Sequence, residues 1–210
     1  MGGEFTPGLF LREGYTITSR GCPNRCWFCS VWKRNSELRE LPIKDGWIIQ
    51  DDNLLACSDQ HINSVFDMLK KQKHRSEFTG GLEARLLKDW HVERLVELKP
   101  KNIFMAYDTP DDYEPLIEAA HKLTERGFTR STIYCYALTG YPKDTFDAAE
   151  KRMNQIIALG ITPFSMLWRN NKGEQSKDWR KFQRAWSRPA LIFSKHKPKG
   201  KDDASANMPD

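Results

Sequence analysis

The sequence has no apolar run of the ~18 residues needed to cross a membrane, so we expect no membrane partner. Its N-terminus also lacks the basic and then apolar stretch of a secretory signal, which favours a cytoplasmic protein. The five cysteines are odd in number and show no regular framework, so structural disulfides are not expected. With 39% hydrophobic and 29% charged residues over 210 positions, the composition excludes a wholly disordered chain and predicts one globular domain, at most with an appendage.

Most of the chain carries nearly equal numbers of basic and acidic residues. Residues 1–168 carry 22 basic and 23 acidic side chains, whereas residues 169–210 carry 11 basic and 5 acidic ones. The formal charge of +5 therefore comes from the C-terminal fifth. A basic segment of this kind indicates where an anionic partner would make contact.

Six segments rich in β-branched and aromatic residues recur along the chain, at residues 15–19, 47–50, 77–79, 103–107, 132–137 and 162–167. Apolar residues with helical spacing lie between several of them, within residues 62–69, 92–96, 113–123 and 149–157. Gly127 and Gly160 follow two of these helical patterns, where left-handed caps are expected. Strands that alternate with helices in this way predict an α/β fold with a parallel sheet. Periodicity alone does not distinguish an open sheet from a barrel.

Three cysteines within eight residues follow the first predicted strand, namely Cys22, Cys26 and Cys29. A short loop with this spacing can aim three thiolates at one point, and soft thiolates suit zinc or an iron–sulfur cluster. A closed zinc site needs four ligands, usually as two pairs, and the sequence has no second pair. A fourth ligand would have to come from the remaining candidates, Cys57, Cys135 or His61. Three cysteines on a four-iron cluster leave one iron open for another ligand.

The spacing Cys-x3-Cys-x-aromatic-Cys, with Phe28 as the aromatic residue, resembles the signature of the radical S-adenosylmethionine superfamily. The resemblance implies a 4Fe-4S cluster held by the three cysteines, with S-adenosylmethionine bound at the open iron. It also implies reductive cleavage of S-adenosylmethionine to methionine and a 5′-deoxyadenosyl radical that abstracts hydrogen from a substrate. A flavodoxin or ferredoxin-type electron donor and sensitivity to oxygen are implied as well.

The family fold is a partial (β/α)6 TIM-like barrel with parallel strands, whose site lies on loops at the carboxyl ends of the strands. The sequence agrees with this expectation, because polar and glycine-rich clusters follow the predicted strands. They occupy residues 51–53, 80–85, 108–109 and 139–142.

The resemblance implies cofactor-binding roles for residues after the second and third strands. Family members often bind the methionine amino group through a Gly-Gly-Glu-Pro stretch, where this chain has Asp51, Asp52 and Asn53. These side chains offer acceptors for an amine, or else form a turn that caps the next helix. Glu83 and Arg85 resemble a Glu-x-Arg pair that would bind the amine or ribose and the methionine carboxylate. A surface ion pair is the alternative for these two.

Besides Phe28, the resemblance implies four further cofactor-binding positions. Gly80 and Gly81 would let the backbone approach the cofactor, or would simply form a turn. Asp108 stands where family members often place a ribose-binding residue, and Gly140 would supply flexibility next to adenine.

The expected organisation is a radical S-adenosylmethionine core at residues 1–169, a basic helical extension at 170–194 and a disordered tail at 195–210. In the extension, one helix face carries three aromatic residues, Trp179, Phe182 and Trp186. They would dock the helix on the core, or form a stacking platform for nucleic acid beside the basic side chains.

The predicted function is therefore that of a radical S-adenosylmethionine enzyme. A nucleoside or nucleic acid is the favoured substrate, and a peptide or small metabolite comes next. The alternative from a different class is a non-enzymatic, zinc-bearing protein that binds nucleic acid. Cys57 and Cys135 are expected to be buried and inert, with a role as hydrogen donor or sulfur carrier as the alternative for Cys57.

Overall fold

The computed structural model describes residues 11–35, 37–170 and 172–195. Its centre is a six-stranded sheet in which every pair of neighbours is parallel and the strands lie in chain order. The strands are β1 (Tyr15–Thr16), β4 (Ile48–Ile49), β5 (Glu77–Phe78), β6 (Asn102–Ala106), β7 (Ile133–Thr139) and β8 (Thr162–Leu167). The predicted α/β fold with a parallel sheet is confirmed. Within the described residues no ladder joins β8 to β1, so the backbone hydrogen bonds do not close a barrel.

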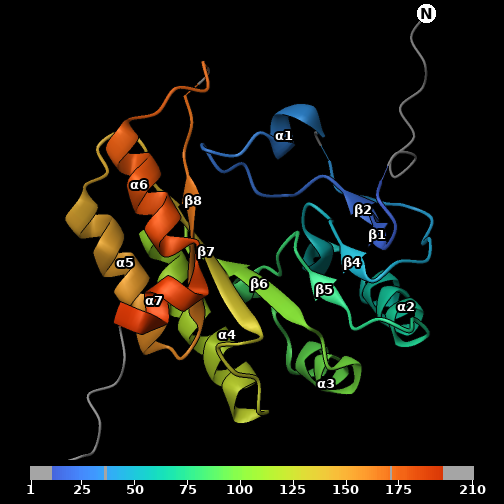
Figure 1. The fold of residues 1–210 in the computed structure, drawn as a ribbon. Helices are drawn as coiled ribbons and strands as arrows, with labels where there is room; N and C mark the ends of the chain where they lie inside the picture. Colours follow the sequence, from blue (N-terminus) through green and yellow to red (C-terminus); the bar gives the residue numbers. More distant parts are fainter. Residues whose placement is uncertain (1–10, 36, 171, 196–210) are drawn as a thin grey trace, which may run out of the picture.

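Helices follow the strands one by one and lie along the outer side of the sheet (Figure 1). The four that the helical patterns predict are α2 (Asp59–Lys70), α3 (Asp89–Leu98), α4 (Tyr113–Glu125) and α5 (Phe146–Ala158). In each, the buried residues recur at helical spacing. Gly127 and Gly160 take positive φ values of 87° and 75°, as expected for left-handed caps. No helix in the described part of the chain combines the length and apolarity that a membrane crossing requires.

The main core lies between the sheet and these helices. Ile103 and Met105 on β6 and Ile133, Cys135 and Ala137 on β7 are completely buried, because alternate residues of a strand face the same side. The expectation that Cys135 is a core residue is confirmed. The intervening positions place a row of aromatic rings on the other face of the sheet, with Phe104 stacked between Tyr134 and Tyr136.

The cysteine loop is framed by elements that the sequence patterns did not predict. The strands β2 (Ser19–Arg20) and β3 (Arg39–Glu40) form an antiparallel pair. In the sequence, the short helix α1 (Val31–Arg34) comes between these two strands. Gly21 starts the loop with a φ of +89°, and its Cα lies so close to the Glu37 carbonyl that any Cβ would collide with it. Only glycine fits this turn.

The C-terminal extension contains α6 (Lys177–Trp186) and α7 (Pro189–Lys195). The ring of Trp179 lies 4.2 Å from that of Phe146 at the start of α5, and Phe182 packs against both. Trp186 is buried in the core. Docking on the core is thus the role of this aromatic face. Of the expected tail, Lys195 ends α7, and residues 196–210 lie outside the described residues.

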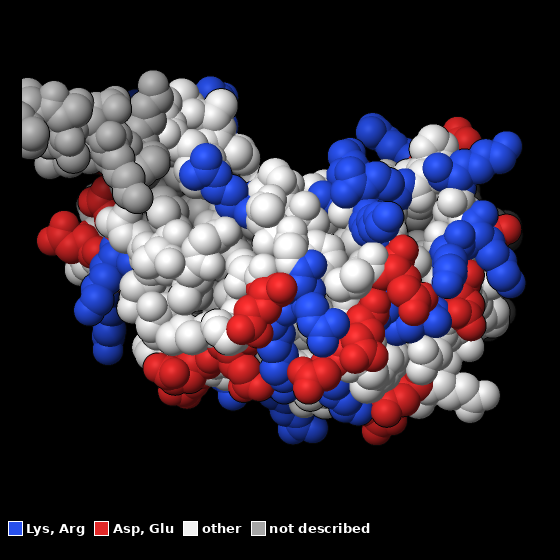
Figure 2. Space-filling model, turned by 90° about the horizontal axis from the view of Figure 1, so that it is seen from below, with Lys and Arg blue, Asp and Glu red and all other residues white. Residues whose placement is uncertain are grey.

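On the face shown in Figure 2, acidic and basic side chains lie next to one another along the lower part, whereas basic side chains predominate at the upper right. Ion pairs of this kind link α2 to α3, as between Lys70 and Glu97 and between Arg94 and Asp67. Such exposed pairs contribute little to stability. They agree with the near-zero net charge of residues 1–168.

Candidate functional site

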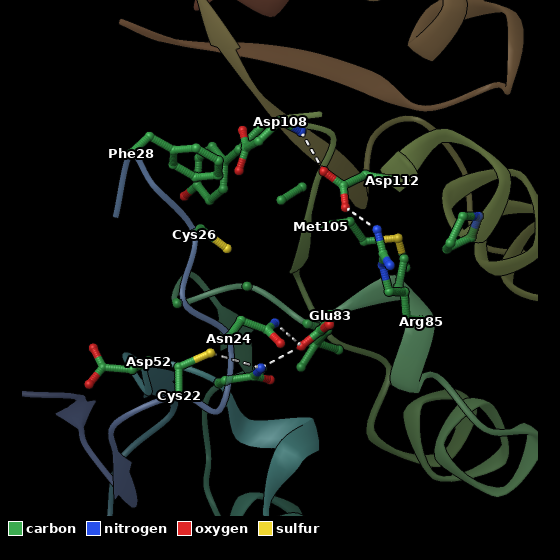
Figure 3. A pocket seen from close by; sticks show the side chains of 18 residues that line it. Cys22, Asn24, Cys26, Phe28, Asp52, Glu83, Arg85, Met105, Asp108 and Asp112 are labelled. Atoms are coloured by element: carbon green, nitrogen blue, oxygen red, sulfur yellow. Dashed lines mark hydrogen bonds and ion pairs between the residues drawn. The ribbon is translucent and has the colours of Figure 1, made fainter. Parts of the chain in front are cut away.

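A cavity of about 180 Å³ opens where the cysteine loop meets the loops that follow β4, β5 and β6 (Figure 3). The carboxyl ends of parallel strands are the usual place for such a site. Ten of the predicted site residues line this cavity: Cys22, Cys26, Phe28, Asp52, Asn53, Gly80, Gly81, Glu83, Arg85 and Asp108. A second hollow of about 440 Å³ shares Cys26 and Glu83 with it.

The three loop cysteines are free and partly exposed. The Cys26 side chain points into the cavity, whereas Cys29 is not part of its lining and its Sγ accepts a hydrogen bond from the Val31 amide at 3.4 Å. Burial raises the pKa of the Cys26 thiol, with further contributions from Cys29 and Cys22, so the three thiols are close enough to interact. Across residues 11–35, 37–170 and 172–195, however, no three His, Cys, Asp or Glu side chains are gathered as a metal-binding group. Ligation by these cysteines stays a prediction.

Asp52 holds the start of the cysteine loop against the end of β4. Its Oδ2 accepts hydrogen bonds from the Gly21 amide at 2.9 Å and from Asn35 Nδ2 at 3.2 Å. Its Oδ1 lies 3.5 Å from Arg20. The carboxylate is therefore engaged in positioning the loop while it borders the cavity.

Glu83 receives two amide donors on one oxygen. Asn24 Nδ2 lies 2.9 Å from Glu83 Oε2, and Asn53 Nδ2 lies 2.5 Å from the same atom. Asn53 Nδ2 also lies 3.4 Å from Cys22 Sγ. The carboxylate is fixed at the cavity wall, where it can accept a hydrogen bond from a bound cation or hydroxyl group.

The loop after β5 comes close to the loop after β4. A Cβ at Gly80 would collide with the backbone of Asp51, so glycine is required at this crossing. The chain then bends at Gly81, with a φ of +93°, and the Leu82 amide donates to the Phe104 carbonyl at 2.7 Å. These contacts place residues 83–85 beside the cysteine loop.

Arg85 forms an ion pair, with Asp112 as its partner at 2.9 Å. Its side chain is 46% exposed and that of Asp112 is 26% exposed. Asp112 Oδ2 also accepts from the backbone amide and hydroxyl of Thr109, so it caps the turn after β6. The alternative expected for Arg85, a surface ion pair, is thus present, and the guanidinium borders the cavity as well.

Asp108 is a cavity residue whose carboxyl pKa lies well above its ordinary value. Its Oδ1 accepts a hydrogen bond from the Leu138 amide at 2.9 Å. Burial, together with the nearby Asp112, raises the pKa of the Asp108 carboxyl to about 7, against the opposing effects of the Leu138 amide and Arg152. This carboxyl exchanges its proton near neutral pH.

Replacing Asp108 with asparagine is expected to change how stability depends on pH. The folded wild type binds more protons at this site than the unfolded chain between about pH 4 and pH 7, so the Asp108 contribution to stability falls as pH rises through that window. Asparagine keeps an oxygen for the Leu138 amide but has no proton to lose. The stability of Asp108→Asn relative to wild type should rise by up to about 1.4 kcal/mol per pH unit. Urea unfolding at pH 5, 6, 7 and 8 measures this difference, and a constant difference would contradict it.

Two predicted cofactor-binding residues lie away from the cavity. Asp51 is 2% exposed, and its carboxylate accepts from the Thr18 amide at 2.6 Å, the Thr18 hydroxyl at 2.5 Å and the Ser19 hydroxyl at 2.9 Å. It therefore holds residues 18 and 19, just before the cysteine loop, against the end of β4. Gly140, with a φ of +70°, packs under Trp179, so α6 covers it. Neither residue is in position to contact a ligand in this cavity.

Sequence reasoning missed Asn24, Asp112 and Tyr136 in the cavity wall. Asn24 lies within the cysteine signature, and Asp112 ends the polar run after β6, so both were within reach of the same reasoning. Tyr136 alternates with the buried Cys135 on β7 and so faces the other side of the sheet. Its hydroxyl donates to the Thr79 carbonyl at 3.2 Å, and burial raises its pKa to about 12.

Neither a scan against models of known protein families nor a search of curated protein sequences finds a match for this chain. The cavity and its chemistry are therefore the basis for any assignment.

Proposed function

We propose that this chain is a radical S-adenosylmethionine enzyme, with its site in the cavity beside the cysteine loop. The observation that carries the proposal is that Cys22 and Cys26 line the same cavity as Glu83, Arg85 and Asp108. These residues come from three separate parts of the chain. A thiol-bearing loop next to acceptors and donors suited to an amino acid and a ribose is the combination that this chemistry needs.

The residues present fit the cofactors in kind. Three free thiols on one loop suit an iron–sulfur cluster, and each of Cys22, Cys26 and Cys29 would supply one ligand. Such a cluster, when bound, supplies the electron that cleaves S-adenosylmethionine into methionine and a 5′-deoxyadenosyl radical, which abstracts hydrogen from the substrate. A flavodoxin or ferredoxin-type protein is proposed as the electron donor.

The chain itself would bind and orient S-adenosylmethionine. Glu83 would accept a hydrogen bond from its amino group, and Arg85 would bind its carboxylate. Asp108 would hold the ribose, while Phe28 and Tyr136 keep water from that side of the cavity. The sheet is proposed to be a partial (β/α)6 barrel, because its strands follow chain order with helices on the outer side.

The test is anaerobic reconstitution of the full chain with iron and sulfide, followed by dithionite reduction with S-adenosylmethionine. Formation of 5′-deoxyadenosine, measured by chromatography, is the expected result. A colourless protein that binds zinc and forms no 5′-deoxyadenosine would overturn the proposal. The zinc-bearing, nucleic-acid-binding alternative would then lead.

For the substrate we propose a nucleoside or nucleic acid, reached through the basic charge of the C-terminal extension. Arg180, Lys181 and Arg184 on α6 are exposed. The aromatic face of the same helix is engaged with α5 and the core, so it provides no stacking platform for bases. The proposed contact is therefore electrostatic. Lys197, Lys199 and Lys201, which would extend it, lie outside the described residues.

Replacing Arg180, Lys181 and Arg184 with glutamine is expected to weaken binding of a single-stranded oligonucleotide. The logarithm of the affinity falls as the logarithm of the salt concentration rises, and each lost phosphate contact should make this slope less steep by about 0.7. Fluorescence anisotropy at several salt concentrations measures both quantities. The control carries the same number of changes on and just after α2, at Lys70, Lys71 and Lys73. Equal losses in both variants would contradict a specific role for α6.

A further inference from the structure

We propose that Asn53 is a positioning residue for the cysteine loop, because its side-chain amide donates one hydrogen to Cys22 and the other to Glu83. Through the first bond it would raise the reduction potential of a cluster held by Cys22. This inference rests on the proposed function. It adds a residue that acts on the cluster through one of its ligands.

The contacts of the Asn53 amide set its orientation. Its Nδ2 lies 3.4 Å from Cys22 Sγ and 2.5 Å from Glu83 Oε2. A thiolate and a carboxylate only accept hydrogen bonds, so the group that faces both must be the NH2 end. Both of its hydrogens are therefore used. This orientation of the amide leaves Asn53 Oδ1 buried without a hydrogen-bond partner among the described residues.

The backbone around Asn53 holds the side chain in place. Asn53 is 5% exposed and precedes a 3-10 turn, Leu54–Ala56. Leu54 and Leu55 in this turn are buried in the core. A side chain anchored in this way can fix the position of its partners, because it has little freedom of its own.

The hydrogen bond to sulfur has a predictable electrostatic effect. Reduction adds negative charge to a cluster and its thiolates, and an N–H group directed at a ligand sulfur stabilises that charge. Loss of the Asn53 donor should therefore make the cluster harder to reduce. Asn24 provides a matched comparison, because it donates to the same Glu83 oxygen at 2.9 Å, whereas the hydrogen bond to Cys22 Sγ in the described part of the chain comes from Asn53.

The experiment uses the full chain, reconstituted anaerobically, as wild type, Asn53→Leu, Asn53→Asp and Asn24→Leu. Leucine and aspartate both keep the approximate size of Asn53, and both lack its donors. The measurement is a redox titration of the cluster followed by EPR, with iron and sulfide content determined for each protein. We expect a more negative midpoint potential in both Asn53 variants and a wild-type potential in Asn24→Leu.

Three results would overturn the inference. A wild-type potential in iron-loaded Asn53 variants would show that the bond to Cys22 has no effect on the cluster. An equal shift in Asn24→Leu would show that the effect passes through Glu83 and not through sulfur. Failure of the wild type to bind iron would overturn the proposed function together with this inference, and the iron content identifies that case separately.

Discussion

Replacement of Cys26 with alanine is expected to abolish binding of a four-iron cluster and formation of 5′-deoxyadenosine. Cys26 lies between the other two loop cysteines in the sequence, and its side chain points into the cavity. Two cysteines are too few to hold the cluster with one open iron, so reductive cleavage has no electron source. Iron analysis and chromatography of anaerobically reconstituted protein measure the two losses.

The matched control is Cys57→Ala. Cys57 is 8% exposed, and burial raises the pKa of its thiol to about 11, so this cysteine stays protonated and is a poor ligand. The control should keep its iron and its activity. Wild-type iron content in Cys26→Ala would contradict the assignment of the loop, and loss of iron in Cys57→Ala would make Cys57 a ligand.

Replacement of Asp144 with alanine is expected to lower the free energy of unfolding by about 3–5 kcal/mol. The Asp144 side chain is completely buried, and it pairs with Arg152, which is 11% exposed, at 2.9 Å. It also accepts from the Gly140 amide at 2.8 Å. Its loss would leave a buried guanidinium without its counter-charge and a backbone amide without its acceptor.

This pair holds the turn between β7 and α5. Arg152 Nη2 donates to the Leu138 carbonyl at 3.0 Å as well, so strand, turn and helix are joined at one point. Urea unfolding measures the expected loss. The control is Asp178→Ala, since Asp178 is 71% exposed and pairs with an exposed lysine, and its cost should stay below about 1 kcal/mol. A cost for Asp144→Ala no larger than the control would show that the buried pair adds nothing to stability.

Much of the fold was predictable because its signals are local. The predicted strands are rich in β-branched and aromatic residues, and the predicted helices have apolar residues at helical spacing, as in α2, where Ile62, Val65, Phe66 and Leu69 are all buried. The β2–β3 pair was not predictable in this way. Three of the four residues in these strands are charged, so they lack the β-branched and aromatic character of the predicted strands, and they are brought together across the cysteine loop.

The candidate site was predictable where position along the chain decides position in space. Residues after parallel strands meet at one end of the sheet, so the cavity gathers residues from after β4, β5 and β6. Asp51 and Asp52 show the limit of this reasoning. They are adjacent in the sequence, but Asp51 is buried against Thr18 whereas Asp52 borders the cavity. Neighbours in an extended segment point in opposite directions, and only the packing decides which one is turned inward.

The sequence by itself determined the parallel α/β fold, the cysteine loop and the strand ends where a site would form, because these depend on residue types at short range. The tertiary structure decided which polar groups are free to act. Asp144 and Arg152 lie eight positions apart, and only folding buries them together. Asn53, Cys22 and Glu83 come from three separate loops, and their shared hydrogen bonds depend on distances set by the packing of the whole sheet.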